Sequence, residues 1–227
     1  MSYNRAIVPA AYASKDALTK DMVGIGFLFA EHGSKNPNIE NTLIAASLEG
    51  VDGEDYRTLS LLVDWLEIHS ERINTDRLTH LVLTLNSERT RCFWTAIAQW
   101  LKKDRRFKKI EMAFRGPRLD LLSTGSEFLV KRSGEDQRFS GTSIRVPQKT
   151  LRHRPKDILS PHQLARCHSI YRSRLIIGPT YRADMWAIVE TEPGISAAEL
   201  ARRSYGSFAT AWQVKRDWNV LNTNEPR

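Results

Sequence analysis

The stretch 87–106 constrains the fold most, because its apolar and polar side chains separate at the period of an α-helix. With about 100° between successive residues, the apolar stripe consists of Phe93, Ile97, Trp100 and Leu101. The opposite stripe consists of Glu88, Arg91, Thr95, Gln99, Lys102 and Arg106. Ser87 is a suitable N-cap. The pattern predicts a helix seated on a core, and its polar stripe is either an ordinary solvated face or a surface that fits a DNA major groove.

Similar signals predict further elements on both sides of this helix. Four helices are expected before it, over 14–29, 38–48, 55–70 and 76–85. After it, residues 110–114 and 119–122 are typical of two strands, and the turn at 115–118 between them carries Arg115 and Arg118. The order helix, helix, helix, hairpin over 61–122 is that of a winged helix, and a plain α+β subdomain with a charged turn is the alternative.

The middle of the chain is expected to contain more β structure and a linker. Strands are predicted over 127–132 and 142–146. Three prolines and several cations in 147–161 indicate a semi-rigid, positively charged linker. A helix over 161–173 follows.

The C-terminal third has its own helix-turn-helix pattern. Helices are predicted over 181–191, 197–204 with Ser196 as cap, and 208–220. Gly206 lies in the turn at 205–207 and is suited to a left-handed backbone. The sequence Ile-Ser-Ala-Ala-Glu-Leu-Ala-Arg at 195–202, followed by a glycine-containing turn and a helix, resembles the helix-turn-helix core of many bacterial regulators.

At the superfamily level, 61–122 and 181–220 therefore resemble winged-helix DNA-binding regulators. The two units share weak internal similarity, which either a duplication or convergence explains. We expect a mainly α fold with a minor β part (α+β) and two helix-turn-helix or winged-helix-like domains in tandem. The division is an N-terminal helical extension (1–54), a winged-helix-like domain (55–123), a β hairpin with a basic proline-containing linker (124–160) and a C-terminal helix-turn-helix domain (161–227).

Positive charge is concentrated in one part of the chain. The net charge of +8 arises from residues 101–176, which carry 19 basic and 7 acidic residues. Residues 1–100 carry 9 basic and 13 acidic residues, and 177–227 carry 6 of each. Such concentration indicates a polyanionic partner, although a generally basic protein is the simpler alternative.

The resemblance to DNA-binding regulators and the distribution of charge together predict three groups of DNA-contacting residues. Arg91, Thr95, Gln99 and Lys102 on the long helix would face bases or nearby phosphates. Contacts to the DNA backbone are assigned to Arg105, Arg106, Lys108, Lys109, Arg115 and Arg118. In the C-terminal unit, Ser207, Gln213 and Arg216 are candidates for reading DNA.

Trp212 lies away from the apolar row of the last helix, beside Gln213 and Arg216. It is predicted either to contact a partner protein or another domain, or to contact DNA. A protein partner or a homodimer is therefore possible in addition to double-stranded DNA.

Signals for catalysis and for cofactors are missing from the sequence. No phosphate-binding loop, zinc-ligand spacing or serine nucleophile motif is present, and Asp64 and Glu67 look like ordinary solvated carboxylates. We expect neither enzyme activity nor a cofactor nor a metal. Cys92 and Cys167 are expected to be separate thiols. With no signal-peptide pattern and no membrane-length apolar run, a cytoplasmic protein is expected.

The function predicted from the sequence is sequence-specific binding of duplex DNA, in a transcriptional regulator. The alternative is a protein-interaction module, such as an antitoxin or an accessory subunit of a defence or toxin–antitoxin system. An enzyme acting on nucleic acid ranks third, and RNA is a possible ligand in place of DNA.

Overall fold

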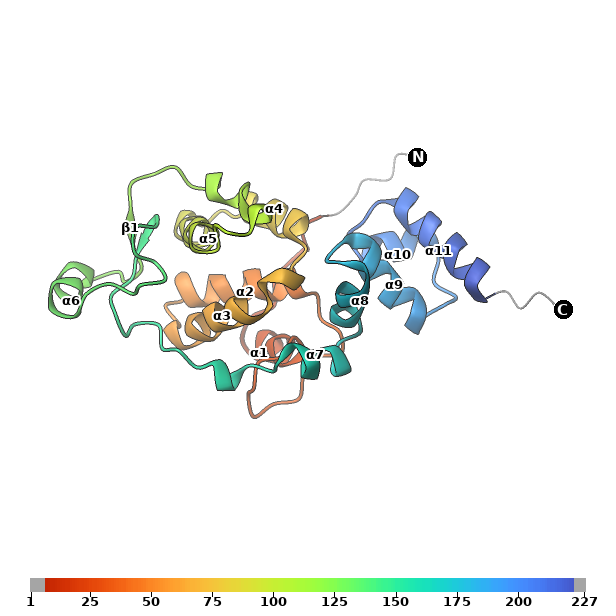
Figure 1. The fold of residues 1–227 in the computed structure, drawn as a ribbon, viewed down its shortest axis with the longest axis horizontal. Helices are drawn as coiled ribbons and strands as arrows, with labels where there is room; N and C mark the ends of the chain where they lie inside the picture. The colour runs from red at the N-terminus through yellow and green to blue at the C-terminus, as the bar shows by residue number, and fades with distance from the viewer. Residues whose placement is uncertain (1–6, 223–227) are drawn as a thin grey trace.

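A computed structural model describes residues 7–222, which form a mainly helical fold with one small sheet (Figure 1). The prediction of a mainly α fold with a minor β part is confirmed. The N-terminal half contains α1 (Lys15–Gly24), α2 (Ile39–Val51), α3 (Tyr56–His69), η1 (Ser70–Arg72), α4 (Thr75–Leu83), α5 (Glu88–Trp100), η2 (Arg105–Phe107) and η3 (Ile110–Met112). The remainder contains β1 (Leu119–Asp120), α6 (Ser126–Ser133), β2 (Ile144–Arg145), η4 (Pro155–Asp157), α7 (Pro161–Cys167), α8 (Ser169–Ile177), α9 (Tyr181–Thr191), α10 (Ala197–Arg203) and α11 (Phe208–Asn222).

Side-chain caps fix where several of these helices begin. Asn38 accepts a hydrogen bond from the amide of Asn41 at the start of α2, and Asp55 accepts those of Arg57 and Thr58 at the start of α3. Asn74 and Ser87 cap α4 and α5 in the same way. Each cap satisfies an amide that the helix itself leaves without a partner. The predicted starts of these helices therefore agree closely with the structure.

One apolar core extends from Leu18 in α1 to Tyr171 in α8, and a second, smaller one lies among α9, α10 and α11. The larger core includes residues on both sides of the divisions predicted after residues 54 and 123. Figure 1 shows α2, α3 and α5 at the centre of this body, with α6 at one end and α9 to α11 at the other. None of the described helices is long and apolar enough to span a bilayer.

α5 is an interior helix, which corrects two predictions. It ends at Trp100, so the helix predicted to reach Arg106 stops six residues earlier. In the predicted polar stripe, Thr95 is buried and Arg91 and Gln99 are partly buried, because η3 and β2 pack against that side. Glu88, in the first turn, is exposed. Thr95 is 1% exposed and donates a hydrogen bond to the carbonyl of Ile110 (3.2 Å), and Trp94 donates to Ser47 Oγ (2.9 Å).

The predicted β-hairpin after α5 was wrong. Residues 110–112 form η3, and β1 pairs in parallel with β2, with Leu119 opposite Ile144. Residues 115–118 therefore do not form the tip of a wing. The strand predicted over 127–132 lies within α6, whereas β2 lies inside the strand predicted over 142–146. Short segments of this kind are ambiguous between helix and strand by periodicity alone.

The proline-containing segment 147–161 is attached to the helical body along its length. The amide of Arg152 donates to Ser60 Oγ (3.0 Å) on α3, and Phe27 pairs with Ile158 in an isolated antiparallel bridge. Farther on, the helix predicted over 161–173 is divided at His168. The His168 side chain accepts the amide of Tyr171 and thereby caps α8.

Candidate nucleic-acid interface

The C-terminal unit consists of α9, α10 and α11 around a small apolar core. Met185, Leu200 and Val214 are fully buried at its centre, one from each helix. Ser196 caps α10 by accepting the amide of Glu199 (3.1 Å), and Ser207 accepts the amide of Thr210 (3.1 Å) at the start of α11. α10 and α11 are thus two capped helices joined by the turn at 204–207, and α11 is the second helix of the pair.

The turn between α10 and α11 depends on two neighbouring residues. Tyr205 has the left-handed conformation (φ 56°) that the sequence suggested for Gly206. Gly206 is needed for a different reason, because a Cβ there would lie 2.3 Å from Cε of Met185. The missing side chain lets the turn lie directly on the core of the unit.

Tyr205 also attaches this turn to the helical body. Its ring centroid lies 3.5 Å from Cζ of Arg77 on α4, and its hydroxyl accepts a hydrogen bond from Asn41 Nδ2 (3.0 Å) on α2. Arg77 is itself fixed by bonds to the carbonyl of Ile7 (2.7 Å) and to Asn38 Oδ1 (3.3 Å). The position of the Arg77 guanidinium is therefore fixed by bonds within the helical body, and the Tyr205 ring stacks on it.

A buried ionic network forms the second attachment. Arg174 on α8 donates to both carboxylate oxygens of Glu40 (2.6 and 3.0 Å) and of Asp184 (2.7 and 2.8 Å), and none of the three is more than 1% exposed. Burial alone would raise the pKa of Glu40, but the charge and hydrogen bonds of Arg174, with the charge of Arg77, hold it below its usual value. Burial is the largest influence on Asp184 and raises the pKa of its carboxyl group. The bonds of Arg174 to Glu40 and Asp184, with Arg77 4.0 Å from Glu40, join α2, α4, α8 and α9.

α11 presents an exposed face away from this attachment. Trp212 is 52% exposed, Gln213 is exposed, and the guanidinium of Arg216 lies 5.4 Å from the Trp212 ring centroid. The opposite row of the helix is buried, and Trp218 contacts Trp186 of α9 edge-on (5.6 Å between centroids). The structure thus brings predicted contact residues Trp212, Gln213 and Arg216 onto one accessible face, with Ser207 at its amino end.

The three contact residues predicted on α5 have structural roles instead. Arg91 donates to the carbonyl of Leu85 (2.7 Å), and Gln99 Oε1 accepts the amide of Ser143 (2.7 Å). Thr95 is inside the core. We therefore correct the assignment of α5 as a helix that lies in the major groove, since its three predicted contact residues are bonded to backbone groups of the protein.

The cations that follow α5 divide into two groups. Six are exposed, and none of them forms an ion pair with another described residue. These are Lys102, Lys103, Arg105, Lys108, Lys109 and Arg115. Arg106 is bound to Asp104 (2.5 Å) and donates to the carbonyls of Ser70 (3.2 Å) and Glu71 (3.2 Å), and Arg118 is bound to Glu135 and to two carbonyls. The last two stabilise the fold, whereas the six free cations are available to an anion.

Asp64, Glu67 and His153 form a cluster whose ligand atoms lie within 4.8 Å of one another. The buried Asp64 carboxylate accepts from His153 Nδ1 (2.9 Å), the guanidinium of Arg138 (3.4 Å) and the amide of Arg154. Both of its oxygens are thus already engaged, one of them by a cation. We interpret Asp64 as the tie between α3 and the 138–154 segment and assign it no metal.

Comparisons with protein-family models, with curated proteins and with solved structures find no match to this chain. The interface is therefore interpreted from its own geometry.

Sequence reasoning missed the residues that orient the C-terminal unit. Glu40, Arg77 and Arg174 are charged residues inside the core, and each is separated from its partner by many positions along the chain. The sequence gives one indication of this network: Asp184 lies next to Met185 among the buried residues of α9. A buried carboxylate in an apolar helix implies a paired cation, but not which one.

Proposed function

We propose that this chain binds double-stranded DNA through its C-terminal unit, with α11 lying in the major groove. The single observation that supports the proposal most is the accessible face of α11 that carries Gln213, Arg216 and Trp212. In helix-turn-helix proteins the second helix presents its exposed side chains to base edges. The role in the cell would be transcriptional control.

The chemistry of this face suits base reading. A glutamine amide donates and accepts at the major-groove edge of adenine, and an arginine donates in pairs to guanine. Gln213 and Arg216 are three positions apart and thus adjacent on the helix surface. The stack of Arg216 on Trp212 limits the freedom of the guanidinium and reduces the entropy lost on binding.

Selection of duplexes from a random pool, followed by fluorescence anisotropy, tests the proposal. The double variant Gln213→Ala, Arg216→Ala should weaken binding to the selected site at least about tenfold, since each good base contact contributes about 1–3 kcal/mol. Binding to random duplex should change much less. Arg166→Ala removes an exposed arginine from α7 and is the matched control, expected to leave both affinities unchanged. Failure to enrich any DNA sequence from the random pool would contradict the proposal that α11 contacts bases specifically.

A second candidate is a protein-interaction module, such as an antitoxin or an accessory subunit of a defence system. The specific observation in its favour is the apolar exposure of α11, where Phe208, Trp212 and Val220 are 44%, 52% and 73% exposed. Large apolar side chains gathered on one face commonly mark a protein contact. Absence of duplex binding at low salt, together with a partner that binds the wild-type chain but not Trp212→Ala, would favour this candidate over DNA.

A further inference from the structure

A groove of about 740 Å³ runs between the basic segment after α5 and the loop that precedes α9. We call it the basic groove. One wall carries Arg105, Lys108 and Lys109. The opposite wall is formed by Pro179 and Thr180, and the amino end of α4 contributes Thr75 and Asp76. The groove therefore lies where the helical body meets the C-terminal unit.

The charge of the groove is strongly positive. Arg105, Lys108 and Lys109 are exposed and form no ion pair with a described residue, while Arg106 contributes to the wall with its guanidinium bound to Asp104. Asp76 is the single carboxylate among the described residues that line it. Three free cations on one wall create a positive local potential that attracts an anion into the groove.

The local structure holds these cations in a fixed row. Asp104 caps η2 by accepting the amide of Arg106 (3.1 Å). Phe107 and Ile110 are fully buried and anchor the segment at both ends of the lysine pair. Lys108 and Lys109 must then point outward from a rigid backbone, in contrast to lysines on a mobile loop.

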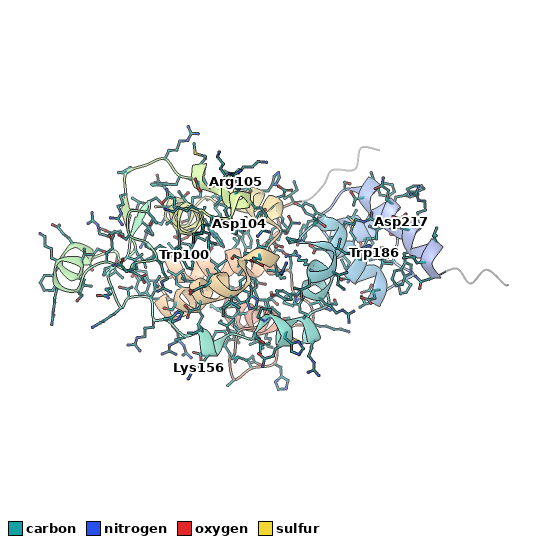
Figure 2. The ribbon with its side chains drawn as sticks, viewed as in Figure 1. Trp100, Asp104, Arg105, Lys156, Trp186 and Asp217 are labelled. Carbon is teal, nitrogen blue, oxygen red and sulfur yellow. The ribbon has the colours of Figure 1, made fainter. Side chains whose placement is uncertain are left out.

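The far wall of the basic groove is part of the unit that contains α11. Thr180 caps α9 by accepting the amide of Ala183 (3.3 Å), and Arg182 of α9 is paired with Asp217 of α11 (2.8 Å). Asp184 fixes α9 to the body through Arg174. In Figure 2, Arg105 and Asp217 lie in the upper half of the view and Lys156 lies at its lower edge. The basic groove and α11 are thus parts of one fixed arrangement.

We propose that the basic groove holds the sugar-phosphate backbone of the same duplex that α11 contacts. The inference rests on the proposed function and adds to it a second, sequence-independent contact on the helical body. Lysines act as point charges toward successive phosphates, and the apolar surface of Met112 and Pro179 suits the deoxyribose rings between them. Residues 177–227 carry no net charge, so the positive charge that attracts phosphate lies on the helical body, where the groove gathers three of its free cations.

The test is the salt dependence of duplex binding by Lys108→Gln, Lys109→Gln. The control is Lys102→Gln, Lys103→Gln, which removes the same charge from two exposed lysines of the same segment that do not line the groove. Each phosphate contact contributes about 0.9 to the slope of log affinity against log salt. The groove variant should lower this slope by about 2 and weaken binding to every duplex, whereas the control should lower it by less than half as much.

Equal losses in the two variants would overturn the groove as the site, because general charge would then explain the effect. An unchanged slope in the groove variant would overturn it as well. If the groove variant keeps its slope while Gln213→Ala, Arg216→Ala loses site selectivity, only the groove is contradicted and the proposed function stands. Absence of any duplex binding by the wild-type chain would overturn both. Circular dichroism melting of each variant confirms that it is folded.

Discussion

The guanidinium of Arg77 stacks on the ring of Tyr205 at 3.5 Å from its centroid, and this contact joins α4 to the turn between α10 and α11. A cation–π pair of this kind contributes about 0.5–2 kcal/mol, and more when water is excluded. Since the turn sets the direction of α11, the orientation of the candidate DNA-contacting face depends on a residue in the body of the protein.

Replacement of Tyr205 by Ala should loosen the C-terminal unit without unfolding the body. The stack and the hydrogen bond from Asn41 are both lost, so we expect hydrogen exchange of α10 and α11 amides to accelerate by about tenfold, equivalent to about 1.4 kcal/mol. Tyr205→Phe keeps the ring and loses only the hydrogen bond, and it should show a smaller effect. Identical exchange in Tyr205→Ala and the wild type would show that the stack does not hold the turn.

Replacement of Arg174 by Met should be strongly destabilising. Two buried carboxylates, Glu40 and Asp184, would be left without their main partner, and such a loss costs about 3–5 kcal/mol. Arg172→Met is the matched control on the same helix, because Arg172 is half-exposed and paired with Glu190 at the surface (2.8 Å). Urea denaturation measures both. A loss of less than about 1 kcal/mol in Arg174→Met would contradict the role assigned to the network.

The fold should lose stability as the pH is lowered from about 6.5 to about 4, a range that lies mostly above the ordinary pKa values of carboxyl groups. Burial lowers the pKa of His69 and that of His168 to about 4, from an ordinary value of 6.5. Between about pH 6.5 and pH 4 the unfolded chain binds protons that the folded chain does not, so stability falls as the pH decreases through this range. Each histidine contributes up to a few kcal/mol, at about 1.4 kcal/mol per pKa unit.

Urea midpoints at pH 7 and pH 5 measure this effect. His162→Gln, an exposed histidine on α7, should leave the difference between the two midpoints unchanged. His69→Gln should reduce that difference. A midpoint that is independent of pH over this range would show that the buried histidines are not neutral in the folded state.

The two tryptophans of α11 should behave oppositely. Trp212 is 52% exposed, so Trp212→Ala should change the melting temperature little and weaken binding of DNA or of a protein partner. Trp218 packs on Trp186 beside the small core, so Trp218→Ala should destabilise the unit by about 2 kcal/mol or more. Thermal melts and binding assays on the two variants separate these effects. Equal destabilisation would mean that Trp212 is also a packing residue.

The sequence by itself determined where most helices begin and that the fold is mainly helical. Asn38, Asp55, Ser87 and Ser196 act as caps through bonds to amides two or three residues away, so their effect is visible in a short stretch of sequence. The exposed side of α11 was also predictable, because one buried row of a helix leaves the opposite row outside.

Only the tertiary structure decided that α5 is an interior helix and that no wing follows it. η3 and β2, two short segments with no clear periodicity, pack against the side of α5 that carries Thr95 and Gln99. Nothing in the sequence of α5 itself therefore reveals that these two residues bond to Ile110 and Ser143. The contact of Arg77 with Tyr205 likewise joins residues far apart in the chain. Local hydrogen bonds and periodicity are encoded in neighbouring residues, whereas burial of a second face depends on which distant segments the folded chain brings against it.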